Sequence, residues 1–228
     1  MSVVTDILKR YDISDDKCKK FEAFGEILKL TNKSFNLTRI TDDESMAMLH
    51  FVDSISPALL GLIPGGAKVI DVGTGGGFPA VPLAIFTDAE ITAVEASEKK
   101  LGFVKKVSDE LGLNIQCICA RAEELGHTDK RESFDICVSR AVANMSMLLE
   151  LLSPFAKVGG KLLCYKGQNC LEEIELSKYA PKKLMLSEPK IHPAGVEGVD
   201  HVIVEYSKTA VLSKTYPRRF AKIKSDPL

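Results

Sequence analysis

Glycines that alternate along a turn are the clearest chemical feature of this sequence. They lie in the run Asp71-Val72-Gly73-Thr74-Gly75-Gly76-Gly77-Phe78, which follows a short apolar segment. Glycines at 73, 75 and 77 remove the Cβ atoms that would keep a ligand away from the backbone. A tight strand-to-helix connection would also explain such a turn taken alone. Three alternating glycines after a strand that carries Asp71 favour a nucleotide-like cofactor.

The spacing of the glycines narrows the class of cofactor. A dinucleotide fingerprint requires glycine or alanine at its sixth position, where this chain has Phe78. A phosphate-binding loop would need Gly-Lys-Ser/Thr, which this run does not contain. The pattern instead resembles motif I of the S-adenosylmethionine-dependent methyltransferases, in which the loop surrounds the methionine and ribose portions of the cofactor.

Carboxylates follow the next two predicted strands. Glu95 ends the second strand, about where an acidic side chain accepts both ribose hydroxyls in Rossmann-like sites. The run from Ala120 to Glu124 follows the third strand, where such enzymes hold adenine. Glu95 could instead be a surface carboxylate at a helix start, and the later run a charge cluster at a helix N-terminus. Together with the glycine loop, the two segments favour a cofactor site.

The residues of the fourth predicted strand bear on the methyl acceptor. Methyl transfer from a sulfonium is an in-line displacement, so an enzyme mainly aligns a lone pair with the methyl group. Enzymes that methylate exocyclic amines carry an Asn/Asp-Pro-Pro-aromatic element here, whereas this chain has Ser139-Arg140-Ala141-Val142. Cys137 lies within the strand, which favours a buried thiol over the nucleophile of a pyrimidine C5 enzyme. An acceptor with an available lone pair, such as guanine N7, needs neither device.

Arg140 is the polar residue of interest at the end of this strand. Its guanidinium could bond a carboxylate or phosphate and stack on a base, or it could form a purely structural ion pair. We assign no general base, because attack by N7 places positive charge on the base and requires no proton to leave.

Alternating strand and helix patterns must position these residues. Up to about residue 60 the pattern is helical, with Ser14 as a predicted N-cap. After Pro64-Gly65-Gly66, short apolar runs alternate with amphipathic segments, which indicates βαβ units. The predicted strands are Lys68–Val72, Ile91–Glu95, Ile115–Ala120, Phe134–Val138 and Lys161–Tyr165. The predicted helices are Phe78–Phe86, Glu98–Leu111, Met145–Phe155 and Cys170–Tyr179.

These elements predict an α/β fold, a mostly parallel doubly wound sheet of the Rossmann-like class I methyltransferase type. Residues 1–66 would form an N-terminal helical cap, residues 67–206 the methyltransferase core and residues 207–228 a basic C-terminal tail. Within the core, Lys183–Leu186 and Val202–Tyr206 are predicted to form a closing antiparallel pair, joined by the stretch from Pro189 to Val199.

Composition sets the outer limits of these predictions. The chain has 228 residues, 45% hydrophobic and 27% charged. Its apolar stretches and the lack of a fixed repeat period or low-complexity tract disfavour a disordered, collagen-like or solenoid protein. The formal net charge is -1, but the last 22 residues carry 6 basic side chains against 1 acidic. Because a local basic patch can meet phosphate, the total charge does not exclude an RNA substrate.

The N-terminal segment and the cysteines predict the compartment. The first residues are charged and lack an apolar signal region, and no segment is long and apolar enough to span a bilayer. We therefore expect a cytoplasmic protein with no membrane partner. The 6 cysteines form no Cys-x-x-Cys pair, which favours reduced core thiols over disulfides, and we expect no metal.

Motifs along nearly the whole chain resemble those of the RsmG (GidB) family, the bacterial 16S rRNA guanine-N7 methyltransferases. They are Asn36-Leu37-Thr38, His50-Phe51-Val52-Asp53-Ser54, the glycine loop through Pro79, Glu95 with Lys99-Lys100, Arg121-Ala122-Glu123-Glu124, Ser139-Arg140-Ala141-Val142, Lys166-Gly167 and Tyr216-Pro217-Arg218. The resemblance implies a site for S-adenosylmethionine that includes Gly73, Phe78, Ala122, Glu123 and Arg140. On general motif grounds we expect Asp71, Gly75, Gly77 and Glu95 beside them.

Several polar residues could contact the RNA. They are Asn36, His50, Asp53, Arg140, Lys166, Arg218 and Arg219. Structural roles are open for them: Asn36 could stabilise a turn, and His50 with Asp53 could fix the cap against the sheet. Lys166 could end its strand simply to reach water.

The resemblance implies transfer of a methyl group to guanine N7 in a loop of 16S rRNA in the small ribosomal subunit. We expect the base to be splayed into a pocket, since the narrow A-form major groove keeps side chains from N7. The partner would be 16S rRNA or the small subunit, and the protein a monomer. Two alternatives remain: a methyltransferase acting on a small molecule or a protein, and a noncatalytic ribosome-assembly factor.

Overall fold

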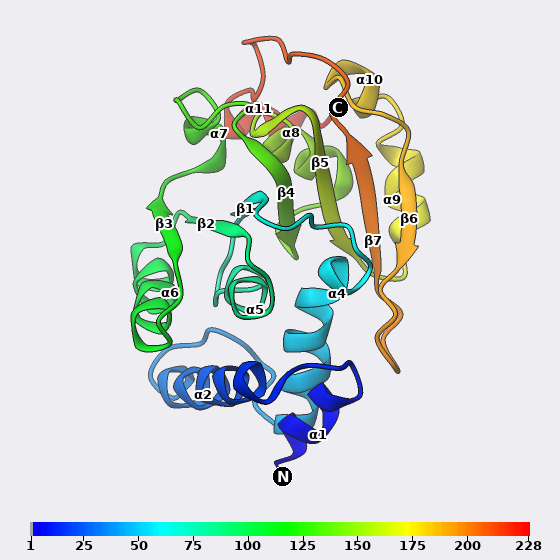
Figure 1. Ribbon diagram of the computed structural model, residues 1–228. Helices are drawn as coiled ribbons and strands as arrows, with labels where there is room; N and C mark the ends of the chain where they lie inside the picture. Colours follow the sequence, from blue (N-terminus) through cyan, green and yellow to red (C-terminus); the bar gives the residue numbers. More distant parts are fainter. Residues whose placement is uncertain (1) are drawn as a thin grey trace.

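A seven-stranded sheet organises the computed structural model, which describes residues 2–228 (Figure 1). The strand order is β3-β2-β1-β4-β5-β7-β6. The first five strands in this order are parallel to one another, and β7 is antiparallel to its neighbours β5 and β6. The strands are β1 (Lys68–Val72), β2 (Glu90–Glu95), β3 (Ile115–Cys119), β4 (Phe134–Arg140), β5 (Ala156–Lys166), β6 (Lys190–Pro193) and β7 (Val202–Ser207). The predicted mostly parallel, doubly wound sheet is confirmed.

Helices cover both faces of this sheet, because its parallel strands are apolar on both sides. Along β1, Val69 points into the core of one face and Ile70 into the core of the other. The first face is covered by α4 (Asp53–Leu59), α5 (Ala80–Phe86) and α6 (Glu98–Glu110). The second is covered by α7 (Ala122–Leu125), α8 (Met145–Leu152), α9 (Cys170–Leu176) and α10 (Ala180–Lys183), and α11 (Phe220–Ser225) packs on α8.

The N-terminal helices extend the core of the first face. They are α1 (Val3–Lys9), α2 (Asp15–Asn32), α3 (Asp43–Ser45) and the π-helix η1 (Met46–Val52), and they lie at the end of the molecule beyond α5 (Figure 1). Ser14 is the N-cap residue of α2, as predicted. The ring of Phe24 lies 5.6 Å from that of Phe51 and 5.2 Å from that of Phe78. The cap therefore packs directly on the glycine loop.

The antiparallel part of the sheet corrects one predicted pairing. The partner of β7 in the hairpin is β6, which lies within the segment that we expected to be the connection. Lys183 instead ends α10, where Pro181 occupies the first helical turn and Leu184 is buried by helix packing. Leu186 makes only an isolated bridge to Lys208.

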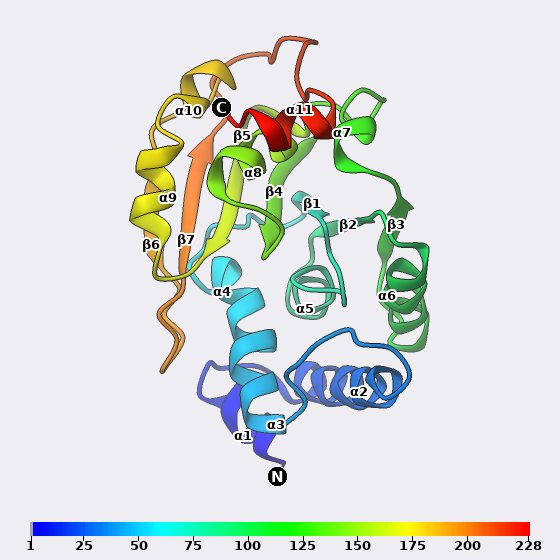
Figure 2. The same cartoon turned by 180° about the vertical axis from the view of Figure 1, so that it is seen from behind.

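The C-terminal residues form a packed segment, which corrects the predicted tail. We call residues 212–226 the C-terminal strap; it runs over α7 and α8 and ends in α11 (Figure 2). Arg131 holds the strap by donating hydrogen bonds to the carbonyl oxygens of Leu212, Ser213 and Tyr216. His127 contacts the carbonyl of Pro217 at 2.9 Å.

The cysteines are all free, and four of them are buried. Cys119 is exposed and Cys117 half-buried, because β3 is an edge strand of the sheet, so these two are not the core thiols that we predicted. Within residues 2–228, no helix is both long and apolar enough to cross a membrane. The same residues contain no group of His, Cys, Asp and Glu side chains that could hold a metal ion.

Candidate functional site

A cavity of about 480 Å³ opens at the carboxyl ends of the parallel strands. The glycine loop after β1 and the first residues after β2, β3 and β4 line it. β1 pairs with β2 on one side and β4 on the other, so the cavity lies where the chain changes direction across the sheet. Ligands of doubly wound proteins bind at this position. We call it the first cavity.

The three predicted glycines have different roles in the loop. All have positive φ: +78° at Gly73, +57° at Gly75 and +89° at Gly77. A Cβ atom on Gly75 would meet only the carbonyl oxygen of Gly73, at 4.0 Å, and Gly75 lines the first cavity. Gly77 does not line it; a Cβ there would lie 2.8 Å from Val81 Cγ2, so this glycine permits packing against α5. Its predicted role in ligand approach is not what the geometry gives.

Gly73 approaches another part of the protein. A Cβ atom on Gly73 would lie 2.4 Å from Cγ2 of Val142, in the loop after β4. Both residues line the first cavity. Gly73 therefore lets the loops after β1 and β4 meet at the cavity wall.

Asp71 is hydrogen-bonded to the residue that follows the glycine loop. Its side chain is completely buried and accepts a hydrogen bond from the backbone N–H of Ala80, the first residue of α5. Burial raises the pKa of Asp71 to about 7. Asp71 does not line the first cavity. It is placed to position the loop, in contrast to the predicted ligand contact.

Glu95 lies in the cavity wall, consistent with its predicted position at the end of β2. One carboxylate oxygen accepts the N–H of Gly75 at 3.1 Å and the other accepts the N–H of Ser97 at 2.9 Å. The carboxylate thus ties the glycine loop to the start of α6. Each oxygen retains a lone pair, so the carboxylate can also accept ligand hydroxyls.

The loop after β3 also lines the first cavity. Ala122 and Glu123 line it, and Arg121 Nε donates to Glu123 Oε1 at 3.1 Å. Met147 of α8 contributes an apolar surface. Phe220 of the C-terminal strap also lines this cavity and was absent from the predicted site. Its position in sequence gave no signal, since only tertiary packing brings the strap here.

Arg140 connects the cavity to the helical cap. Its Nη1 donates to the carbonyl oxygen of Leu49 at 2.9 Å and to Asp53 Oδ2 at 2.8 Å. Leu49 lies in η1, and a π-helix is frequent at functional sites. The guanidinium carbon lies 5.1 Å from the centre of the Phe78 ring. The structural ion pair that the sequence left open is therefore present, and Arg140 still lines the cavity.

His50 is stacked on Phe78, with ring centres 4.4 Å apart. Its Nδ1 lies 3.3 Å from Arg140 Nη2, and its Nε2 lies 2.7 Å from the hydroxyl of Thr38. Arginine only donates, so Nδ1 accepts and Nε2 carries the proton of a neutral ring. Burial, and then the charge of Arg140, lower the pKa of His50 to about 4. The ring is neutral at pH 7.

His201, which sequence reasoning missed, joins this network. Its Nδ1 lies 2.9 Å from Asp53 Oδ1, so the Asp53 carboxylate contacts both His201 and Arg140. The hydrogen bond to Asp53 raises the pKa of His201. No local motif marks His201, because it precedes β7 and reaches Asp53 only in the folded protein.

A second cavity of about 470 Å³ adjoins the first. Arg140, Ala141, Val142 and Ala143 line both cavities, so the loop after β4 separates them. The far wall includes Gly167 and His201. The two cavities could therefore hold two molecules on either side of one loop.

Lys166 holds that loop in place. The lysine side chain is 7% exposed, and Nζ donates to the carbonyl of Ala143 at 2.9 Å and to Glu173 Oε2 at 2.6 Å. The same Glu173 oxygen accepts the N–H of Met145. Lys166 lines the second cavity, but these bonds engage its ammonium group, which departs from the solvated or phosphate-facing lysine that we expected.

Of the remaining residues predicted to contact RNA, two are exposed and one forms an ion pair within the protein. Asn36 is exposed, next to the cavity-lining Leu37 and Thr38. Arg219 is exposed at the N-terminus of α11. Arg218 binds the buried carboxylate of Glu150, so the structure engages this predicted RNA residue in an ion pair.

Apolar and polar groups both line the first cavity. Ala122, Met147 and Phe220 supply apolar surface for a flat ring, and the glycine loop allows close approach to its backbone. Glu95 can accept hydroxyls. These residues fit S-adenosylmethionine, as the motifs predicted.

Comparisons with known proteins agree with this geometry. Residues 17–199 match the family model described as GidB, rRNA small subunit methyltransferase G. The chain is 38% identical to ribosomal RNA small subunit methyltransferase G of Clostridium perfringens (strain 13 / Type A) over 95% of this chain and 93% of that protein. It is 36% identical to the protein of the same name from Pseudothermotoga lettingae, over 100% of both chains.

Solved structures show the fold. One is a putative S-adenosyl-L-methionine-dependent methyltransferase from Methanococcus maripaludis, with a TM-score of 0.57 and 16% identity, covering 82% of this chain and 93% of that one. Another is fibrillarin of Aeropyrum pernix with natively bound S-adenosyl-L-methionine, with a TM-score of 0.51 and 17% identity, covering 66% and 72%. The predicted Rossmann-like class I methyltransferase fold is confirmed.

Proposed function

The chain belongs to the RsmG (GidB) family of rRNA small subunit methyltransferases, and we propose that it methylates N7 of a guanine in 16S rRNA with S-adenosylmethionine. The observation that carries the proposal is the pair of cavities separated only by the loop after β4. Methyl transfer needs a cofactor and an acceptor in line, and two adjoining cavities provide places for both.

The residues of the first cavity would hold the cofactor. The glycine loop would contact the methionine and ribose portions, with Glu95 accepting ribose hydroxyls. Ala122 and Glu123 would border the adenine ring. When bound, S-adenosylmethionine supplies an electrophilic methyl group on a sulfonium.

The second cavity would receive the guanine. His201 and the loop from Arg140 to Ala143 would orient the base so that N7 faces the first cavity. Arg140 is fixed by Asp53 and the Leu49 carbonyl, so its position need not change during the reaction. Attack by the N7 lone pair releases no proton, so these residues bind and align the base and exclude water.

The partner would be the small ribosomal subunit or its 16S rRNA, and this substrate implies action in the cytoplasm. The exposed Asn36 precedes the cavity-lining Leu37, and the exposed Arg219 lies on the strap; both would contact RNA. We expect a monomer, which light scattering of the purified protein would test.

One labelling experiment tests the function. The purified protein is incubated with methyl-labelled S-adenosylmethionine and either small subunits or naked 16S rRNA from a strain without the modification. The RNA is then cleaved chemically at 7-methylguanine to map the label. Label at one guanine supports the proposal, and the Gly73→Asp variant provides the control without cofactor binding. Absence of label from both RNAs overturns it, and label in a protein or metabolite would support the alternative acceptor class.

A further inference from the structure

Phe220 belongs to the last helix of the chain, yet it lines the first cavity. We propose that Phe220 is a cofactor-binding residue that covers the adenine ring, so that the C-terminal strap must be docked for tight cofactor binding. The identity of the cofactor rests on the proposed function. The inference adds a residue from outside the motifs and a dependence of the site on the C-terminus.

The position of Phe220 places it at the adenine end of the cavity. Its ring lies under the guanidinium of Arg121, with 5.0 Å from the guanidinium carbon to the ring centre. Arg121 precedes Ala122 and Glu123, the residues expected beside adenine. The glycine loop, expected beside the methionine and ribose portions, follows β1, which β2 separates from β3 in the sheet.

The chemistry of this end suits a flat aromatic ligand. Phe220 supplies an aromatic surface, Met147 and Leu151 supply aliphatic surface from α8, and Arg121 supplies a planar cation. Purine rings stack on aromatic side chains and on guanidinium groups, and such stacking is worth about 1–3 kcal/mol per base. Without the strap, this end of the cavity would lose its aromatic wall.

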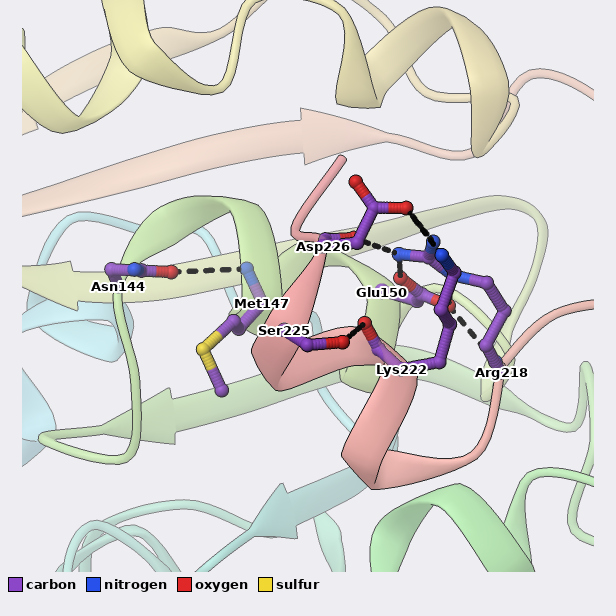
Figure 3. A network of polar contacts seen from close by, with 7 residues as sticks. All are labelled: Asn144, Met147, Glu150, Arg218, Lys222, Ser225 and Asp226. Carbon is purple, nitrogen blue, oxygen red and sulfur yellow. Dashed lines mark hydrogen bonds and ion pairs between the residues drawn. The ribbon is translucent and has the colours of Figure 1, made fainter.

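The strap is anchored to the same helix that forms the cavity wall. Arg218 donates to both oxygens of Glu150, at 2.9 Å from Nε and 2.7 Å from Nη2, and the Glu150 side chain is fully buried (Figure 3). Glu150 lies on α8 between Met147 and Leu151, both of which line the cavity. Arg218 is two residues before Phe220. This ion pair, together with the hydrogen bonds of Arg131 to the strap carbonyls, therefore links docking of the strap to closure of the cavity.

This arrangement has a thermodynamic consequence. A ligand that contacts Phe220 stabilises the docked strap, and docking must raise ligand affinity by the same factor. The docked strap also fixes α11, which presents the exposed Arg219 and Lys224. Cofactor binding would then order part of the basic surface that faces RNA.

Calorimetry with S-adenosylhomocysteine and with adenosine tests the cofactor contact. We expect Phe220→Ala to weaken both ligands by roughly 10-fold or more, because both contain adenine. Phe220→Leu keeps apolar bulk without the aromatic face and should weaken binding less. Tyr179→Ala removes an exposed aromatic residue outside both cavities and should leave affinity unchanged. Wild-type affinity in both Phe220 variants would overturn the inference.

Hydrogen exchange tests the dependence on the strap. S-adenosylhomocysteine should slow exchange in residues 212–226 of the wild-type protein and have a much smaller effect in Phe220→Ala. Equal slowing in both proteins would contradict the coupling. Neither measurement involves RNA, so failure of methyl transfer alone would overturn only the proposed function. Unchanged binding in the variants of an enzyme that labels RNA would overturn only this inference, and no binding by the wild-type protein would overturn both.

Discussion

The guanidinium of Arg140 and the carboxylate of Asp53 form an ion pair of 2.8 Å between β4 and α4, and the two side chains are 14% and 1% exposed. Asp53 also contacts His201, and Arg140 also contacts His50. Arg140 lines both cavities. The helical cap, the sheet and the segment before β7 therefore meet at the point where cofactor and acceptor would react.

Removal of the Asp53 carboxylate should destabilise the whole protein. Asp53→Ala leaves the Arg140 charge mostly buried without a carboxylate, which typically costs about 3–5 kcal/mol. Urea unfolding would measure the loss, and calorimetry of the folded variant should show weaker S-adenosylhomocysteine binding. Asp16→Ala, at an exposed carboxylate of α2, is the matched control. A loss below about 1 kcal/mol would indicate that the pair is not a structural junction.

The lowered pKa of His50 predicts that the free energy of unfolding falls in mild acid. Its pKa is lowered from 6.5 to about 4 by burial and Arg140, so between those pH values the unfolded chain binds a proton that the folded protein excludes. The contribution is complete above pH 6.5 and is lost as the pH falls to 4, by at most about 3 kcal/mol. His50→Asn should reduce this dependence in urea unfolding at several pH values. An identical slope in both proteins would refute the neutral ring.

The sequence predicted the sheet well but the site only in part. Parallel strands are apolar on both faces, so runs such as Lys68–Val72 are visible without knowledge of their neighbours. The glycine loop and Glu95 are local signals beside the strands that position them. Phe220 and His201 reach the cavities through contacts between distant segments, which no local pattern encodes. The Arg218 charge was visible, but its buried partner Glu150 was not.

Alanine substitutions at two glycines of the loop should affect different properties of the protein. Gly73→Ala places a Cβ at the cavity wall against Val142, so we expect S-adenosylhomocysteine affinity to fall at least 10-fold. Gly77→Ala drives a Cβ against Val81 of α5, so it should chiefly lower the free energy of unfolding, by about 1–3 kcal/mol. Calorimetry and urea unfolding of both variants separate the two effects. Equal affinity losses at equal stability would contradict the division.

His201 should affect the acceptor more than the cofactor. It lines only the second of these two cavities, and its Nδ1 is fixed by Asp53. We expect His201→Ala to raise KM for the RNA substrate by roughly 10-fold, a loss of about 1.4 kcal/mol, with S-adenosylhomocysteine affinity nearly unchanged. His192→Ala, which alters a histidine outside both cavities, is the control. A fall in cofactor affinity without a change in KM would assign His201 to the other site.

The basic residues of the strap divide into one anchor and an exposed group. Arg218→Ala strands the fully buried Glu150 carboxylate and should cost about 3–5 kcal/mol of unfolding free energy. Arg219 and Lys224 are exposed and form no ion pair within residues 2–228. Arg219→Ala with Lys224→Ala should leave stability unchanged within about 0.5 kcal/mol.

The same double variant should weaken RNA binding through lost phosphate contacts. Each such contact contributes about 0.7–0.9 to the slope of log affinity against log salt concentration, so the slope should become shallower by about 1–2. Fluorescence anisotropy with a 16S rRNA fragment across a potassium chloride series would measure it. Lys182→Ala with Lys190→Ala removes two exposed charges from α10 and β6 and is the matched control. An unchanged slope in the strap variant would show that RNA does not contact these two side chains, because loss of a phosphate contact must reduce counterion release.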